Sequence, residues 1–136
     1  MGNVVVALLA SLPFLYGAWA AGDPRAGVPL VAVAMPLHFA REVAKDLDDV
    51  RGDAGWRATL ALRSGATAAR WTAAGATAIF GGAVAMLAGG NARLWVMLLP
   101  ALACAAVAAV RLATARSAAA TLYKAAMVCA MLALLV

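Results

Sequence analysis

The chain has 136 residues, of which 66% are hydrophobic and 12% are charged, and its mean hydropathy is +0.92. Soluble domains carry roughly 25% charged residues, so this composition excludes an ordinary water-soluble globule and indicates a protein embedded in the lipid bilayer. The net charge of +5 does not indicate a nucleic-acid partner. The basic residues are spread between apolar segments and form no stripe mixed with stacking aromatic residues.

Five apolar segments follow one another and predict an all-α transmembrane bundle that forms a single membrane domain over residues 1–136. These segments cover residues 4–21, 28–40, 71–89, 94–110 and 118–136. All but the second approach the roughly 20 residues needed to cross the hydrocarbon core. Because the second is short, we expect its helix either to end in a water-filled cavity or to continue past Arg41 as a polar helix shielded by its neighbours.

Small residues predict where these helices pack, because they let two backbones approach closely in lipid. The candidates are Gly75, Gly81, Gly82 and the many alanines of the apolar segments.

Positive charges are divided unequally between the two sides of the membrane. With five crossings, nine of the eleven Lys and Arg residues lie on the side of the N-terminus and of the 41–70 loop. Arg25 and Arg93 lie on the other side. The positive-inside rule therefore predicts a multi-pass protein of the cell membrane whose N-terminus and 41–70 loop are cytoplasmic.

Five of the six acidic residues lie close together, directly after the second apolar segment. Four of them share one face of a helix that continues from this segment, because they are spaced by four, three and four residues. These four residues, which we call the carboxylate ladder, are Glu42, Asp46, Asp49 and Asp53. The fifth, Asp48, falls off that face. We expect Gly52 to end or bend the helix after Arg51, which would place Asp53 on a turn.

The carboxylate ladder needs a positive partner, since like charges at this spacing repel by about 0.2–0.5 kcal/mol per pair. Arg41, Lys45 and Arg51 lie close by in the sequence. A hard divalent cation such as Mg²⁺ is another candidate, because it prefers carboxylate oxygens and is commonly shared with a substrate phosphate. The competing interpretation is a solvated loop with mixed charges.

The segment resembles the second aspartate-rich motif of the UbiA superfamily of intramembrane prenyltransferases, and is most similar to its digeranylgeranylglyceryl phosphate synthase-like group. The residues that carry the resemblance are Arg41, Glu42, Lys45, Asp46, Asp49, Gly52 and Asp53, followed by Gly55 and the pair Thr59-Leu60. The chain departs from the pattern at Ala61, where many members have proline.

The resemblance implies nine transmembrane helices around a cavity, with two aspartate-rich motifs facing each other on the cytoplasmic side. The second motif follows the sixth helix, so the five segments here would match helices five to nine. No match exists for the first motif, Asn-Asp-x-x-Asp-x-x-x-Asp, and the chain has about half of the family's length. We therefore expect a truncated reading frame, which the opening Met1-Gly2-Asn3 favours; a degenerate remnant or half of a split enzyme with a separate N-terminal half are the alternatives.

In the mechanism that the resemblance implies, both motifs hold Mg²⁺ against the diphosphate of a prenyl donor such as geranylgeranyl diphosphate. The carbon–oxygen bond ionises and an acceptor attacks the allylic cation. Carried over to this chain, Asp46, Asp49 and Asp53 are the catalytic and metal-binding candidates, while Lys45 and Arg41 would contact the diphosphate.

Two further polar residues lie in or beside the motif. Glu42 is either a metal ligand or the partner of Arg41 or Lys45, and the partner role is favoured. His38 lies one turn before the motif, and a lone histidine on an apolar helix is more often a structural hydrogen-bonding group than a base.

The sequence thus predicts part of a UbiA-type prenyltransferase of isoprenoid biosynthesis. It would transfer an isoprenoid from a prenyl diphosphate to a lipid-like or aromatic acceptor, and would be inactive without the missing half. The alternative is a small non-enzymatic membrane protein, such as a transporter subunit or assembly factor, with an acidic cytoplasmic loop. An upstream reading frame encoding four spans and the first motif would favour the enzyme.

Overall fold

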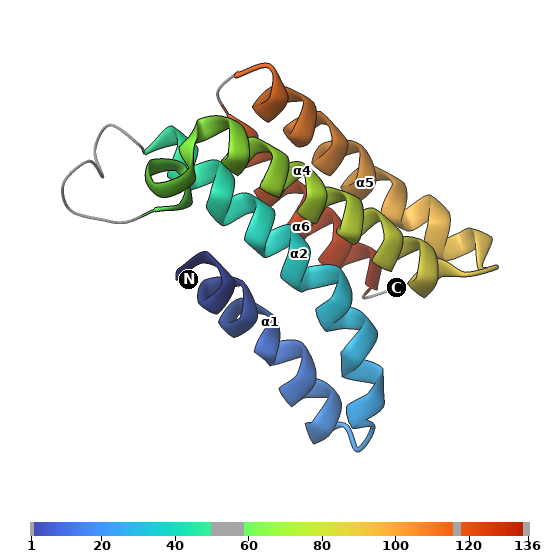
Figure 1. Cartoon of the computed structure of the whole chain (residues 1–136). Coiled ribbons are helices and arrows are strands. Elements are labelled where there is room, and N and C mark those ends of the chain that lie inside the picture. The colour runs from blue at the N-terminus through green and yellow to red at the C-terminus, as the bar shows by residue number, and fades with distance from the viewer. Residues whose placement is uncertain (1, 50–58, 116–117, 135–136) are drawn as a thin grey trace.

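The computed structural model describes residues 2–49, 59–115 and 118–134, and all regular elements in these ranges are α-helices (Figure 1). The five helices are α1 (Gly2–Ala20), α2 (Pro24–Asp48), α4 (Leu60–Ala88), α5 (Ala92–Ala113) and α6 (Ala119–Leu134). The predicted all-α bundle is confirmed. By length and composition, α1, α4 and α5 could each cross a membrane. The apolar stretch of α2 is interrupted by prolines and bounded by arginines, and α6 has only 16 residues.

Helix α2 extends well beyond its apolar stretch. It begins after Asp23, whose side chain accepts a hydrogen bond of 3.2 Å from the backbone N–H of Arg25. It continues past Arg41 to Asp48, and Val43 and Ala44 in this extension are fully buried. The expected polar extension shielded by its neighbours is therefore present. The helix ends at Asp48, before the end that was expected after Arg51. Arg51 and Gly52 lie outside the described residues.

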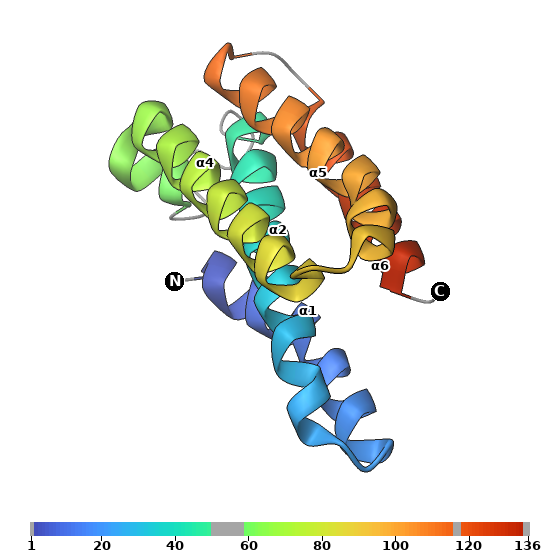
Figure 2. The ribbon, with the colours of Figure 1, turned by 90° about the vertical axis from the view of Figure 1, so that its right-hand side faces the viewer.

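Helix α2 is also the centre of the bundle, since it packs against α1, α4 and α6. Helices α5 and α6 lie side by side, and α1 lies at the edge of the bundle against α2 (Figure 2). The largest fully buried side chains include Tyr123 of α6 and Phe80 of α4. The Tyr123 hydroxyl forms a 2.8 Å hydrogen bond with the hydroxyl of Thr77, which satisfies the buried phenol and joins α6 to α4.

Small residues pack these helices together, but the glycines do so differently from what the sequence predicted. Many alanines of α2, α4, α5 and α6 are buried in the common core, as expected. The prediction for Gly75, Gly81 and Gly82 was wrong, because a Cβ atom at any of them would meet no atom of the described residues within 4 Å. The close contact is at Gly27 instead, where a Cβ would lie 3.0 Å from Ala18 Cβ and so block the approach of α1 to α2.

Helix α4 is broken near its start. Thr59 caps it by accepting a hydrogen bond of 3.3 Å from the backbone N–H of Leu62. At Gly65 the backbone has φ 84° and ψ 156°, a conformation that essentially only glycine adopts without strain. The break separates a short first segment, residues 60–64, from the long apolar helix that follows.

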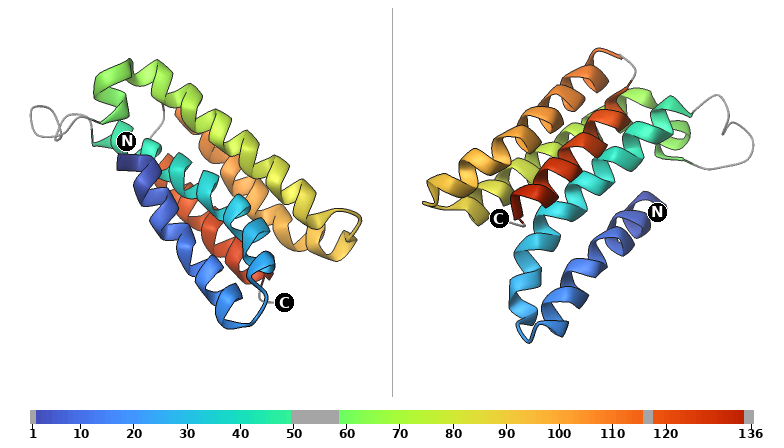
Figure 3. Two further views of the ribbon diagram at one scale, coloured as in Figure 1. Left: turned by 60° about the horizontal axis from the view of Figure 1, so that its bottom comes forward. Right: turned by 180° about the vertical axis from the view of Figure 1, so that it is seen from behind.

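The up-and-down course of the helices brings distant parts of the chain to one end of the bundle. The start of α1, the end of α2 and the start of α4 meet there, together with the α5–α6 connection (Figures 1 and 3). The opposite end holds the α1–α2 and α4–α5 connections, next to which Arg25 and Arg93 lie. This arrangement places Glu42, Asp46 and Asp49 at the same end of the bundle as Lys45 and Arg63.

Candidate functional site

A cavity of about 400 Å³ opens at this end, between the start of α1, the end of α2 and the first segment of α4. We call it the ladder cavity, because three members of the carboxylate ladder line it. Its charged lining residues are Glu42, Lys45, Asp46, Asp49 and Arg63. Its uncharged polar lining residues are Asn3, Thr59 and Ser64. Positive and negative groups thus face one space, although no single segment of sequence supplies them all.

The helical spacing of the carboxylate ladder predicts this cavity lining well. Glu42 and Asp46 lie on α2, and Asp49 is its C-cap, held by a 2.9 Å bond from its backbone N–H to the carbonyl of Lys45. Asp48 is exposed and does not line the ladder cavity. Partial burial of its carboxyl, and then the charge of Asp49, raise the pKa of Asp48 above its usual value. The fourth member, Asp53, lies outside the described residues.

Asp46 is held by a residue that the sequence did not single out. The side-chain amide of Asn3, on the first turn of α1, donates a hydrogen bond of 2.7 Å from Nδ2 to Asp46 Oδ2. The two residues are 43 positions apart, so no local spacing links them. Their contact follows from the antiparallel packing of α1 against α2.

The cations are arranged differently from what the motif implied. Lys45 lines the ladder cavity, whereas Arg41 forms an ion pair with Glu42 and does not line the cavity. Glu42 therefore takes the favoured role of partner to Arg41. The Nε atom of Arg41 is buried and finds no hydrogen-bond acceptor among the described residues. The predicted contact of Arg41 with a diphosphate stays a prediction, and His38 also lies outside the cavity lining.

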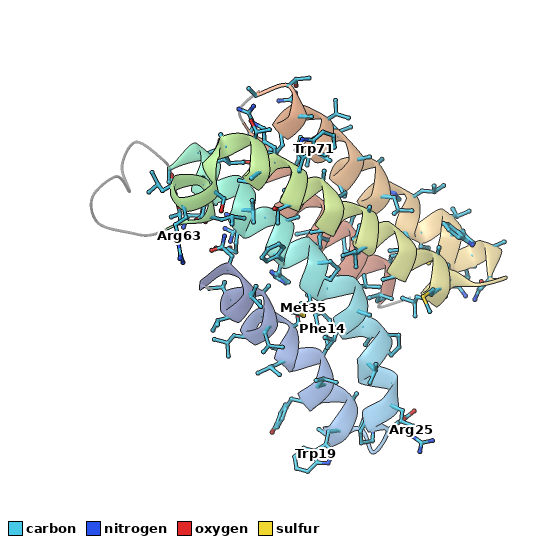
Figure 4. The ribbon with its side chains drawn as sticks, in the orientation of Figure 1. Phe14, Trp19, Arg25, Met35, Arg63 and Trp71 are labelled. Carbon is cyan, nitrogen blue, oxygen red and sulfur yellow. The ribbon has the colours of Figure 1, made fainter. Side chains whose placement is uncertain are left out.

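Arg63 is a second functional candidate that the sequence did not single out. It lies on the short first segment of α4, beside the N-terminal end of α1 (Figure 4), and its side chain lines the ladder cavity. The available signal was Thr59, a residue type that commonly caps helices and that marks the start of α4 before Arg63. The break at Gly65 then lets this segment turn towards α2.

The two carboxylates suit a cation whose coordination shell is completed by water or by substrate phosphate. Among residues 2–49, 59–115 and 118–134, no three His, Cys, Asp or Glu side chains converge closely enough to hold a metal ion. Mg²⁺, however, is commonly held by one or two carboxylates, with water and substrate phosphate completing its shell. Asp46 and Asp49 in one cavity fit that mode, and Lys45 and Arg63 line the same cavity.

An apolar groove of about 440 Å³ adjoins the ladder cavity, and Val4 and Phe39 line both. The groove lies between α1, α2 and α4. Its remaining lining residues are Met35, Pro36, Thr72, Gly75, Ala76 and Ile79. A charged cavity thus lies beside an apolar groove, at one end of a helical bundle with the composition of a membrane protein.

Comparison with known proteins agrees with the motif resemblance, because curated relatives of this chain are named digeranylgeranylglyceryl phosphate synthase. The protein of that name from Halobacterium salinarum is 50% identical over 52 residues, which are 38% of this chain and 19% of the relative. The Methanothermobacter thermautotrophicus protein is 37% identical over 59 residues, or 43% and 21% of the two chains. The Thermococcus kodakarensis protein is 45% identical over 53 residues, or 39% and 19%.

The resemblance to this group of UbiA-type prenyltransferases is therefore confirmed over part of the chain. The matched segment spans only about a fifth of each relative. The same 52 residues are 38% of this chain and 19% of the Halobacterium protein, so that relative is about twice as long. No family model and no solved structure matches the chain.

Proposed function

We propose that this chain is the part of a UbiA-type prenyltransferase that carries the second aspartate-rich motif, equivalent to helices five to nine. The observation that carries the proposal is the ladder cavity with its adjoining apolar groove. A prenyl diphosphate has an anionic head for the cavity and a branched apolar tail for the groove. The similarity to digeranylgeranylglyceryl phosphate synthases supports this ligand class, of which geranylgeranyl diphosphate is the first to test.

The lining residues divide into two chemical groups. Lys45 on α2 and Arg63 on α4 would donate charge-assisted hydrogen bonds to diphosphate oxygens. Asp46 and Asp49, joined by Asp53, would hold Mg²⁺, which supplies stabilisation of the negative charge that develops on the leaving diphosphate. The apolar groove would bind the isoprenoid chain and limit the access of water to the reacting allylic carbon.

The proposed transfer breaks the bond between the allylic carbon and the bridging oxygen of the donor. The electron pair of that bond leaves with the diphosphate. A nucleophilic atom of a lipid-like or aromatic acceptor forms the new bond to the same carbon and releases a proton. The part of the fold that carries the first motif would complete the site, either from the same polypeptide or from a separate N-terminal half. The ladder cavity would face the cytoplasm in the cell membrane.

Ligand binding tests this proposal on the chain as it stands. Radiolabelled geranylgeranyl diphosphate should bind the purified chain in nanodiscs, and EDTA should weaken the binding because Mg²⁺ is shared with the diphosphate. Arg63→Ala should lower the affinity at least about 10-fold, since it removes a charge-assisted bond worth about 1.5–3 kcal/mol. Arg93→Ala, which removes an exposed arginine at the opposite end, is the matched control and should leave the affinity unchanged. If neither EDTA nor Arg63→Ala changes the affinity, the proposal is rejected and the non-enzymatic alternative is favoured.

A further inference from the structure

The carboxylates of the ladder cavity differ in how their charges are compensated. Glu42 forms an ion pair with Arg41, so a cation of the protein already offsets its charge. Asp46 has a neutral partner instead, since Asn3 is its hydrogen-bond donor among the described residues. An amide donor orients a carboxylate without neutralising it, whereas a Lys or Arg donor would do both. Asp46 is thus fixed in orientation and keeps its charge.

The hydrogen bond also divides the two oxygens of Asp46. Nδ2 of Asn3 donates a hydrogen bond of 2.7 Å to Oδ2, and no described residue donates a hydrogen bond to Oδ1. Both side chains line the ladder cavity and both are partly buried, which limits the exchange of this bond with water. The first two turns of α1 are otherwise apolar, so Asn3 is the one polar side chain that this part of the helix offers.

We infer that Asn3 is a positioning residue, whose amide holds the Asp46 carboxylate so that Oδ1 presents its full charge to a divalent cation in the ladder cavity. The inference rests on the proposed function, because it assigns a role in the proposed metal site. Groups that hydrogen-bond a metal-ligating carboxylate commonly change metal affinity by 10–100-fold. We therefore expect an effect of that size when the amide is removed.

Mn²⁺ binding measures this role without any catalytic assay. The purified chain is titrated with Mn²⁺, and the free ion is followed by its paramagnetic resonance signal. Asn3→Leu keeps the size of the side chain, removes the donor and should weaken binding at least 10-fold. Asn3→Lys keeps a donor but adds a positive charge beside Asp46, so it should weaken binding as much. Asn91→Ala, a change of the chain's other asparagine at the far end of the bundle, should have no effect.

The outcomes separate this inference from the proposed function. If the unmodified chain does not bind Mn²⁺, the proposed metal site and the inference fail together. If it binds Mn²⁺ and Asn3→Leu binds equally well, only the inference fails. If Asn3→Lys restores the affinity that Asn3→Leu loses, any donor is sufficient and the neutrality of the amide has no role, so the inference that Asp46 must keep its full charge is rejected. Loss of affinity in both variants supports it.

Discussion

Neighbouring carboxylates at the end of α2 occupy different environments, although they differ little in sequence context. Asp46 and Asp49 line the ladder cavity together with Lys45, whereas Asp48 lies outside the lining. The partial burial of Asp48 and its proximity to Asp49 favour its protonated form, as the raised pKa indicates. Because Asp48 lies outside the cavity lining, it serves as an internal control for Asp46 and Asp49.

In a protein that joins this chain to the part carrying the first motif, Asp46→Ala or Asp49→Ala should lower Mg²⁺-dependent prenyl transfer by at least about 10²-fold, as expected for the loss of a group that stabilises developing charge. Asp48→Ala should change the rate only a few-fold. Asp53→Ala should match the first two if the motif holds, or Asp48→Ala if Gly52 turns it away. The assay uses membranes with equal amounts of each variant. Equal rates for Asp49→Ala and Asp48→Ala would show that lining the ladder cavity does not identify the functional carboxylates.

Helical periodicity explains why part of this site is predictable from the sequence. Glu42, Asp46 and Asp49 follow one another within two turns, so their common face depends only on the local backbone. Asn3 and Arg63 come from other helices, and their places depend on how α1 and α4 pack against α2. No spacing in the sequence contains that information. Asp53 lies outside the described residues, and its role stays a prediction.

The break in α4 is an element on which the site depends. A Cβ at Gly65 would meet no atom within 4 Å in residues 2–49, 59–115 and 118–134, so the cost of a side chain there is conformational and not steric. With φ at 84°, that cost is about 1–3 kcal/mol. The segment that carries Arg63 lies directly before this residue.

Gly65→Ala should therefore destabilise the start of α4 and weaken binding of geranylgeranyl diphosphate by shifting Arg63. Gly82→Ala is the matched control, because Gly82 lies within the regular part of the same helix and also has open space around its Cα. That change should stabilise the helix by about 0.5–1 kcal/mol and leave binding unchanged. Denaturant unfolding in detergent and the binding titration measure both effects. A stabilising Gly65→Ala would contradict the assigned backbone conformation.

Apolarity and charge predicted the number of helices, because lipid leaves backbone groups no partner except those within the helix. They did not predict which glycine would lie at a helix contact. Gly27 meets α1 because the tight α1–α2 turn brings these two faces together, while Gly82 lies on an exposed face of α4. Packing faces are set by all the helices jointly, which a single segment does not reveal.

For the whole molecule, we predict that the ladder end faces the cytoplasm, since nine of the eleven basic residues belong to that side. In a variant with Cys104 and Cys129 replaced by alanine, Ser64→Cys should react with an impermeant maleimide only after the cells are permeabilised. Ala92→Cys, at the exposed start of α5, should react in intact cells. The reverse pattern would overturn both the orientation and the proposed function.

A further whole-molecule prediction is that the 136-residue chain binds a prenyl diphosphate but does not transfer the prenyl group. The ladder cavity supplies carboxylates from one aspartate-rich motif, and the proposed reaction needs metal on a second side of the diphosphate. Radiolabelled geranylgeranyl diphosphate with candidate acceptors should give no prenylated product with the chain alone. Turnover by the purified chain would show that one motif is sufficient.

The close contact at Gly27 has a consequence for how the protein enters the membrane. Helix α2 carries too little apolar surface to qualify as a span by itself, whereas α1, which precedes it after three residues, does qualify. The backbones of the two helices meet at Gly27, so they can form a tightly joined hairpin before the rest of the chain is synthesised. The translocon would then release α1 and α2 into lipid as one unit, with α1 supplying the hydrophobic free energy that carries the polar end of α2 to the membrane surface.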